Sequence, residues 1–251
     1  MTDITEMRYY VIMNLKKPDI APDKTLLTAG CHSPGGFRVA FAKTFCVAPG
    51  NGVRVRLRVD RINTPLGPMM AVCDETHLFL LEFANRKNMD RQIERLSKHQ
   101  RRAIGPGRTA ITDQIEAELE DYFAVGLKSF QTPLKLSGTD FQKTVWRALT
   151  GIPFGETRSY SDLAKAIGNE KAVRAVASSN AGNGHAIIIP CHRVINKDGR
   201  LGGYAGGPNR KNRLLRHECK HAGKDIQAMP PLSGRKHPHW SEKGMGILTV
   251  I

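Results

Sequence analysis

Residues 187–194, with the sequence IIIPCHRV, are the stretch around which the rest of the chain is interpreted. Three isoleucines run into a proline, and Cys191, His192 and Arg193 follow before the chain becomes apolar again. A short apolar run that ends at a proline favours a buried strand. We therefore expect a strand that presents one thiol to a pocket.

Cys191 is the candidate nucleophile of this stretch. A thiolate is the reactive form of cysteine, so the thiol needs a base or a positive field beside it. His192 follows directly, but successive side chains of a strand point to opposite faces, so we expect the imidazole to reach the thiol through a bridging water. Glu218, in the last predicted helix, is the carboxylate that could orient the imidazole. From these residues alone, an unreactive buried cysteine remains the alternative.

The charge of the chain is strongly positive and is concentrated near Cys191. The 251 residues include 38 Lys and Arg and 23 Asp and Glu, which gives a net charge of +15. Residues 137–218 contain 13 basic and 6 acidic residues, so this segment alone has a net charge of +7. A polyanion, DNA or RNA, is the expected partner. A soluble protein with an ordinary basic surface is the alternative.

The cysteines and the hydropathy pattern limit the class of protein. An odd number of cysteines without a CxxC pair argues against a disulfide framework and against a zinc site, so we expect free thiols and no bound metal. The chain has no run of about 18 apolar residues, and its N-terminus lacks the apolar part of a signal peptide. We therefore expect a soluble, cytosolic protein. The five cysteines are Cys31, Cys46, Cys73, Cys191 and Cys219.

Residues 1–52 are predicted to form a separate N-terminal segment. The first half is polar and broken by prolines, which favours a linker. In residues 26–50, Phe37, Phe41 and Phe45 recur on one face of a predicted helix. This part resembles the second helix-turn-helix of AraC-type regulators, without a counterpart of the first. A short helix that packs three phenylalanine rings onto a neighbour is the alternative.

Residues 53–136 are predicted to form a compact scaffold domain. Alternating apolar and polar residues indicate a half-buried strand, and two further apolar runs flank a turn. We expect a small antiparallel sheet with helices beside it and no residues that suggest chemistry. The predicted strands are 53–60, 69–74 and 77–83, the predicted helices are 88–99 and 113–124, and the loop between these helices is 101–108.

Residues 137–218 are predicted to form a helical domain with a helix-turn-helix. Apolar residues recur at helical spacing in four segments, 140–149, 159–167, 171–182 and 210–218. Ser159 and Gly168 would begin and end the second helix. The third helix carries mostly small side chains, and Arg174 is its long one. Such a helix suits close contact with the minor groove of DNA. An alanine-rich helix packed in the core is the alternative. Residues 219–251 are predicted to be a basic, flexible tail.

Several short motifs accompany Cys191 along the chain. They are 141–146 (FQKTVW), 152–160 (IPFGETRSY), 172–177 (AVRAVA), Asn183, 188–195 (IIPCHRVI), 199–204 (GRLGGY) and 211–218 (KNRLLRHE). Together they resemble the O6-alkylguanine-DNA alkyltransferase family, also called methylated-DNA–protein-cysteine methyltransferases, which includes the C-terminal part of bacterial Ada proteins. The resemblance spans residues 53–218, and its Pro-Cys-His-Arg-Val core is highly specific.

The resemblance implies a role for each residue of the site. Cys191 would accept the alkyl group, and His192 would deprotonate it through a water while Glu218 orients the imidazole. Asn183 would hold the geometry of the turn before the strand. Tyr160 would help to push the target nucleotide out of the duplex and would donate a hydrogen bond to the guanine ring, where negative charge develops.

The resemblance also implies the contacts to DNA. Arg174 would fill the place of the extruded base, and Arg193 would be structural or would face a phosphate. Ala205 stands where some family members have a hydroxyl group. The helix would meet the DNA through Ala172, Arg174, Ala175 and Ser178. The substrate pocket would be walled by Gly203, Tyr204, Ala205 and Gly206.

We therefore predict an α+β protein. A small antiparallel-sheet and helix scaffold domain would be followed by a helical, winged-helix-like domain that contains the helix-turn-helix, the DNA-binding surface and the catalytic residues. By the resemblance, the protein would repair double-stranded DNA that contains O6-alkylguanine, and also O4-alkylthymine, in a single turnover and without a cofactor. It would be a cytoplasmic, nucleoid-associated monomer.

Two other classes of protein are the alternatives. A Cys-His-Glu hydrolase or transferase with true turnover would need a route that regenerates the thiol, and the sequence suggests none. A non-catalytic DNA-binding regulator is suggested by residues 26–50 and by the charge. Ada proteins also carry a cysteine-rich zinc module that accepts methyl groups from phosphotriesters, and without a four-cysteine set we do not expect that activity.

Overall fold

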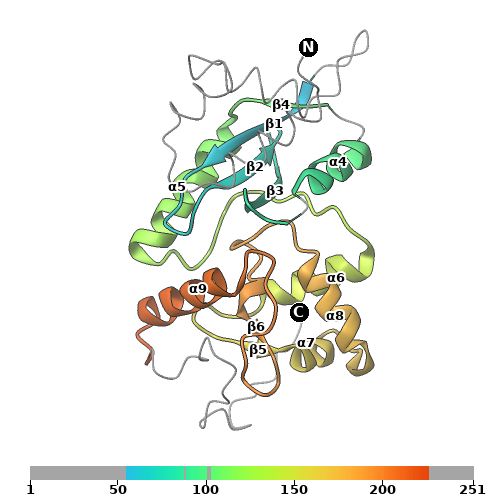
Figure 1. Ribbon diagram of the computed structural model, residues 1–251, viewed down its shortest axis with the longest axis vertical. Helices are drawn as coiled ribbons and strands as arrows, with labels where there is room; N and C mark the ends of the chain where they lie inside the picture. The colour runs from blue at the N-terminus through green and yellow to red at the C-terminus, as the bar shows by residue number, and fades with distance from the viewer. Residues whose placement is uncertain (1–54, 88, 101–102, 226–251) are drawn as a thin grey trace. The chain divides into compact units, whose positions relative to one another are not determined.

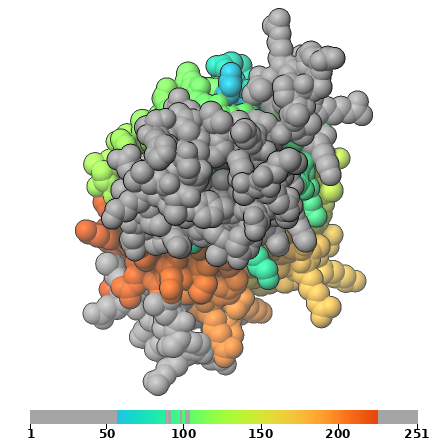
Figure 2. All heavy atoms as spheres, turned by 45° about the horizontal axis from the view of Figure 1, so that its top comes forward, coloured from blue at the N-terminus to red at the C-terminus, as the bar shows by residue number. Residues whose placement is uncertain are grey.

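The computed structural model describes residues 55–87, 89–100 and 103–225, which Figure 1 and Figure 2 colour by their position in the chain. The segment that resembles AraC-type regulators, residues 26–50, lies outside the described residues, and so does the tail after residue 225. No helix within the described ranges is long and apolar enough to cross a membrane.

The chain divides into two compact units, and the division passes through a helix. The first unit holds the described residues up to Asp121 together with Phe130–Ser137. The second holds Tyr122–Ser129 together with the described residues from Gly138 onward. Residues 122–129, which the sequence placed in the scaffold, therefore group with the helical unit.

The first unit is built on a four-stranded sheet. Its strands are β1 (Val55–Ile62), β2 (Met69–Cys73), β3 (Leu78–Phe83) and β4 (Ala103–Pro106). They lie in the order β3-β2-β1-β4. The first three are the strands predicted from the sequence, and they pair antiparallel as expected.

The fourth strand corrects the prediction, which placed a loop at 101–108 and expected an antiparallel sheet. β4 pairs with β1 in parallel, so the sheet is mixed. It lies at the edge of the sheet, where Pro106, which has no amide hydrogen, is tolerated. Four residues are too few to show a period of two, so only the pairing with β1 reveals them as a strand.

Two helices complete the first unit, α4 (Met89–Gln100) and α5 (Ala110–Val125). In α4, Met89, Ile93 and Leu96 are buried at the i, i+4 and i+7 positions, which is the spacing of one helix face. This face joins a core cluster of sheet residues, which are Leu57, Val59, Met70, Val72, Phe79, Leu80, Ala84 and Ile104.

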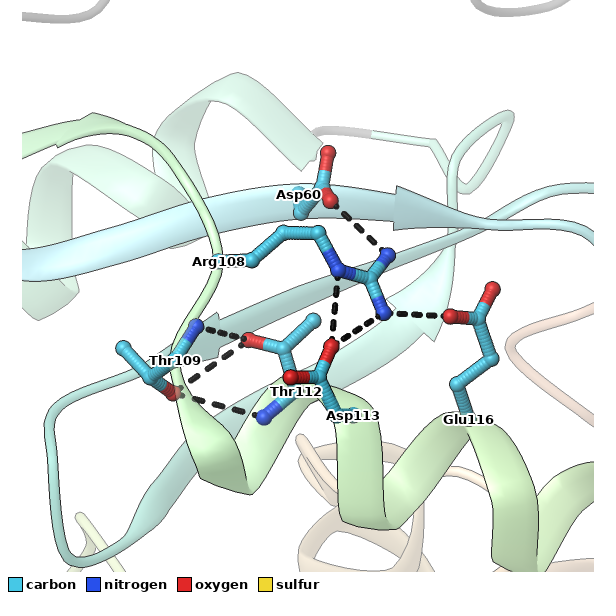
Figure 3. A network of polar contacts seen from close by, with 6 residues as sticks. All are labelled: Asp60, Arg108, Thr109, Thr112, Asp113 and Glu116. Carbon is cyan, nitrogen blue, oxygen red and sulfur yellow. Dashed lines mark hydrogen bonds and ion pairs between the residues drawn. The ribbon is translucent and has the colours of Figure 1, made fainter.

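Arg108, in the loop between β4 and α5, ties β1 to the first turns of α5 (Figure 3). Its guanidinium donates to Asp60 at 3.1 Å, to Asp113 at 2.6 Å and also to Glu116. Single exposed ion pairs contribute little, but one guanidinium that holds three carboxylates forms a network. These contacts fix the loop that leads from the sheet into the helix.

The second unit is mainly helical. Its elements are α6 (Asp140–Thr150), β5 (Arg158–Ser159), α7 (Tyr160–Ala166), the 3-10 helix η1 (Glu170–Ala172), α8 (Val173–Ala181), the 3-10 helix η2 (Cys191–Arg193), β6 (Val194–Ile195) and α9 (Pro208–His221). β5 and β6 form a short parallel pair. α6, α7 and α8 pack against one another. α7 and α8 are the two helices of the predicted helix-turn-helix.

Local signals explain where these helices begin and end. Thr139 caps α6 and Ser159 caps α7, each in a capping box in which the side chain three residues later bonds back to the amide of the cap. Gly168 follows α7 with a φ of 72°, the left-handed conformation that the sequence predicted there. The helix predicted at 171–182 is divided, because its first turn is the 3-10 helix η1.

The buried strand predicted in residues 187–194 is wrong except at Val194, which begins β6, and Cys191 lies in the 3-10 helix η2. Residues 187–189 are the part that departs furthest from a strand. These residues form turns, and Ile187 has a φ of 73°, which a β-branched residue adopts only when its surroundings impose it. The Asn183 side chain supplies the bonds that a partner strand would have made. Its amide donates to the carbonyls of Ile189 at 2.9 Å and His185 at 3.3 Å, and its oxygen accepts from the His185 amide at 2.9 Å. An apolar run has no period that distinguishes such a buried turn from a buried strand.

Candidate active site

Two asparagine side chains hold Cys191. The cysteine is the first residue of η2, and 4 % of it is exposed. Asn183 Nδ2 donates to Sγ at 3.1 Å, and Asn180 Nδ2, from α8, donates to the Cys191 carbonyl at 3.4 Å. A donor at sulfur stabilises the thiolate more than the thiol. The same amide that shapes the preceding turn therefore also acts on the nucleophile.

One ring nitrogen of His192 is hydrogen-bonded to a carboxylate, and the other has no hydrogen-bond partner among the described residues. Its Nε2 lies 2.7 Å from Glu218 Oε1, and both side chains are fully buried. A carboxylate only accepts, so we assign the proton to Nε2 and the lone pair to Nδ1. Nδ1 is buried and has no hydrogen-bond partner among the described residues. Burial lowers the pKa of His192 and outweighs the opposing effect of Glu218, so the imidazole is neutral and can take up a proton.

Glu218, in α9, accepts five hydrogen bonds. Its Oε1 accepts from His192, from the Tyr122 hydroxyl at 2.8 Å and from Arg193 Nη2 at 3.0 Å. Its Oε2 accepts from Arg193 Nε at 2.8 Å and from the Gly155 amide at 3.2 Å. Burial would raise the pKa of Glu218, but the hydrogen bond from His192 and the hydrogen bonds and charge of Arg193 outweigh it and hold the pKa far below its usual range. Glu218 is therefore a fixed anion.

Of the two roles expected for Arg193, structural or facing a phosphate, its contacts favour the structural one. Two of its nitrogens bind Glu218, and Nη1 donates to the Ile152 carbonyl at 2.6 Å. The guanidinium also lies over the Phe154 ring, 5.7 Å from its centroid. The residue is buried. Since its donors are engaged inside the protein, Arg193 does not face a phosphate.

Lys211 is a buried residue of this region whose role the sequence did not suggest. Its Nζ donates to the Val194 carbonyl at 2.5 Å and to the Gly203 carbonyl at 3.1 Å, so it joins β6 to the glycine-rich loop. Burial lowers the pKa of Lys211 to about 8, against the opposing effect of Cys191. Tyr122 was also missed. Each residue interrupts the apolar stripe of an amphipathic helix, which was the available signal.

Two tyrosines predicted at the site lie near the thiol and the imidazole. Burial and then the charge of Cys191 raise the pKa of Tyr160, the first residue of α7, so its hydroxyl is within electrostatic reach of the thiol. The Tyr204 and His192 rings are nearly perpendicular, with 6.4 Å between the ring centroids. A Cβ on Gly202 would lie 3.5 Å from the Tyr160 ring. The glycine-rich loop therefore runs beside Tyr160.

The remaining predicted pocket residues differ in exposure. Gly203 is exposed, Ala205 is partly exposed and Gly206 is buried. The Gly206 carbonyl accepts from Arg210 Nη1 at 3.0 Å, which fastens the end of the loop to α9. Gly203 and Ala205 can therefore be reached by a ligand, whereas Gly206 is held within the protein.

The small residues of α8 lie on its outer face. Arg174, Ala175 and Ser178 are exposed, and Ala172, which precedes the helix, is partly exposed. The opposite face is buried through Val176, Ser179 and Asn180. The alternative of an alanine-rich helix enclosed in the core is wrong. The surface that was predicted to meet DNA is open to a partner.

Among the described residues, the two cysteines other than Cys191, which are Cys73 and Cys219, show no sign of a reactive site. Burial raises the pKa of Cys73 to about 11 and also raises that of Cys219. Both are free thiols and both are buried. Within residues 55–87, 89–100 and 103–225, no group of three or more His, Cys, Asp or Glu side chains is arranged to hold a metal ion. Cys31 and Cys46 lie outside these ranges.

The chain is similar in sequence to proteins of one known family. Residues 140–220 match the family model described as the DNA-binding domain of 6-O-methylguanine DNA methyltransferase. A methylated-DNA–protein-cysteine methyltransferase of Salmonella typhimurium is 42% identical over 168 residues, which is 65% of this chain and 96% of that protein. One of Mycobacterium tuberculosis is 41% identical over 165 residues, covering 66% of this chain and 94% of that protein.

Solved structures agree with these sequence matches. A crystal structure of the Mycobacterium tuberculosis O6-methylguanine methyltransferase is 38% identical, with a TM-score of 0.57, and the match covers 68% of this chain and 97% of that one. The Mycobacterium tuberculosis OGT in complex with DNA is 37% identical, with a TM-score of 0.56, and the match covers 71% of this chain and 97% of that one. With this similarity along nearly the whole length of its relatives, the chain belongs to the methylated-DNA–protein-cysteine methyltransferase family.

Proposed function

We propose that this protein repairs DNA by transferring the alkyl group of O6-alkylguanine to Sγ of Cys191, once per molecule. One observation carries the proposal: a buried, neutral His192 with its Nε2 on a fixed carboxylate and its Nδ1 unbonded among the described residues, directly after the cysteine. The family membership supplies the reaction class. No residue of this relay needs a cofactor for the transfer.

The proton of the thiol has a path through this arrangement. A water that bridges Sγ and His192 Nδ1 passes the proton to the imidazole, and Glu218 stabilises the imidazolium that forms. Asn183 donates to the sulfur at 3.1 Å and supports the thiolate. The thiolate then attacks the alkyl carbon. The new S–C bond forms as the C–O bond breaks, and its electron pair leaves with the guanine oxygen.

The leaving guanine is an anion until it takes up a proton. A hydrogen bond from Tyr160 to the ring would lower the barrier because it acts where this charge develops. The product on Cys191 is a thioether, which is a poor leaving group. Since no second nucleophile in the described site could displace it, each molecule acts once.

The alkyl group must be brought out of the stacked duplex to reach a thiol that is almost fully buried. Extrusion of a base costs a few kcal/mol, and least for a damaged base. The exposed small residues around Ala175 and Ser178 allow close approach of a groove, and the exposed Arg174 can occupy the vacated position. We place the protein on duplex DNA as a monomer, in the cytoplasm with the nucleoid.

Intact-mass measurement tests the proposal directly. The protein is mixed with duplex DNA that contains O6-methylguanine, and we expect a gain of one methyl group per molecule, mapped to Cys191. Cys191→Ser should gain none, and Cys219→Ser, which removes another buried thiol, should react like the wild type. A wild-type mass that stays constant, or a methyl group found on Cys191→Ser, would refute the proposal. A parallel duplex with O4-methylthymine tests the second predicted substrate.

A further inference from the structure

Tyr122 contacts Glu218 of the relay and is not one of the site residues predicted from the sequence. It lies in the last turn of α5, it is fully buried, and its hydroxyl donates to Glu218 Oε1 at 2.8 Å. The same oxygen accepts from His192 Nε2 at 2.7 Å. We infer that Tyr122 is a positioning residue that holds the Glu218 carboxylate and, through it, orients and tunes His192. The inference rests on the proposed function.

The ring of Tyr122 is fixed by aromatic neighbours. It meets Phe123 and Phe154 edge-on, with ring centroids 5.0 Å and 6.1 Å away, and His217 lies tilted at 5.0 Å. His217 Nε2 also bonds to the Tyr122 carbonyl at 2.6 Å. Such contacts hold both the backbone and the ring, so the hydroxyl has one place to donate. Replacement by Phe would leave this packing intact and remove only the donor.

The hydroxyl competes with His192 for one oxygen. A carboxylate offers about four lone-pair sites, roughly two on each oxygen. Oε1 takes three donors, from Tyr122, His192 and Arg193, so none of them has the full charge of the oxygen. Without the Tyr122 hydroxyl, more of that charge would act on the His192 Nε2–H group. The imidazolium would then be more stable, and the carboxylate would be held at fewer points.

The direction of the pH effect follows from this competition. Burial lowers the pKa of His192, while Glu218 acts to raise it. Removal of the Tyr122 hydroxyl strengthens the Glu218 effect, so the pKa of His192 moves up. Since the neutral imidazole is the form that takes the thiol proton, the acid limb of the rate profile moves to higher pH. Other titratable or charged groups that face His192, Glu218 or Tyr122 are Arg193, Tyr204, Lys211 and His217.

The test compares Tyr122→Phe with Phe123→Leu, which disturbs the same aromatic cluster but removes no donor. Single-turnover methyl transfer to Cys191 is followed by mass from pH 5 to 9, and the His192 titration is followed by NMR in DNA-free protein labelled at histidine. For Tyr122→Phe we expect transfer about tenfold slower, which corresponds to the loss of one hydrogen bond to a charged group. We also expect the acid limb and the His192 titration to move up by about half a unit. Phe123→Leu should have the same acid limb of the rate profile and the same His192 titration as the wild type.

Two results would overturn the inference. One is a Tyr122→Phe variant in which the transfer rate, the acid limb of the rate profile and the His192 titration all match the wild type. The other is a slower variant whose limb and His192 titration stay in place, which is the pattern of a purely structural residue. Failure of the proposed function is distinguishable, because the wild type would then gain no methyl group, while the His192 titration of the DNA-free protein would still report on the Tyr122 contact.

Discussion

Replacement of Glu218 by Gln is the sharpest test of the buried relay. The substitution keeps the shape of the side chain and removes its charge, and it leaves one acceptor oxygen where five donors converge. The new amide group would face N–H groups of Arg193 or Gly155. Arg193 would then be a buried cation without its counter-ion. Breaking such a buried pair costs about 3–5 kcal/mol, which corresponds to a fall in Tm of roughly 6–20 °C.

The effect depends on pH in a direction that the structure determines. The folded-state pKa of Glu218 lies below its unfolded value of about 4.3. Its contribution to stability is therefore fully present above that value and is lost as the pH falls through the folded-state pKa. The stability difference between the wild type and Glu218→Gln should stay constant from neutral pH to about pH 5 and should shrink below it.

Urea unfolding and thermal melts of both proteins, from pH 7 to pH 3, measure this difference. Glu156→Gln is the matched control, because Glu156 is a partly exposed carboxylate of the same unit, paired with Arg158 and Lys224, and should cost less than about 1 kcal/mol. If Glu218→Gln melted within two degrees or so of the control, the view of Glu218 as the buried counter-ion of Arg193 would be untenable.

Three further changes probe other parts of the chain. Arg174→Ala should slow methyl transfer by about tenfold or more and should weaken binding to undamaged duplex DNA by only about twofold, because one exposed cation contributes little to the overall affinity. Equal losses in a transfer assay and in a filter-binding assay would show that Arg174 only contacts a phosphate. Lys211 has a pKa of about 8 in the folded protein, which is below its unfolded value. The free energy of unfolding of the wild type relative to Lys211→Met should therefore rise by about 1–3 kcal/mol as the pH goes from 8 to 10. If urea unfolding showed a difference that does not change with pH, the buried ammonium would be contradicted. Arg108→Ala should lower the free energy of unfolding by only about 1 kcal/mol, and by less in high salt, because the guanidinium is one-third exposed. The transfer rate should stay unchanged, because the ion-pair network of Arg108 is confined to the first unit. A loss of several kcal/mol that does not depend on salt would contradict this.

Much of the fold could be predicted because its signals are local. Ser159 has its capping partner three residues away, Gly168 marks the end of α7 by its conformational freedom, and the strands β1 to β3 show their faces in the alternation or burial of adjacent residues. Cys191, His192 and Glu218 could be named because a specific pattern surrounds them. Each of these signals lies within one element.

The missed features depend on partners that are distant in the sequence. The Tyr122 hydroxyl meets a carboxylate 96 residues away, and Arg193 meets the same group 25 residues away. For Arg193 the sequence leaves a structural role and a phosphate contact both open, because only the fold shows that its charge is neutralised inside the protein by Glu218. The turn at 187–189 was read as a strand for a related reason. Its hydrogen bonds come from the side chain of Asn183, and a side chain leaves no period in the sequence.

The burial of Cys191 determines how this single-use reagent is kept before it meets DNA. Oxidation of cysteine requires both thiolate character and access from solvent. With 4 % of the residue exposed and a neutral imidazole as the nearest base, peroxides and disulfides reach the sulfur poorly. An electrophile then reacts with the Cys191 sulfur only when an extruded nucleotide delivers it into the protein. The chemical reactivity of the electrophile alone is not sufficient for this reaction. The fall in the number of unreacted molecules therefore counts the lesions that have been repaired, with little loss to chance oxidation in the meantime.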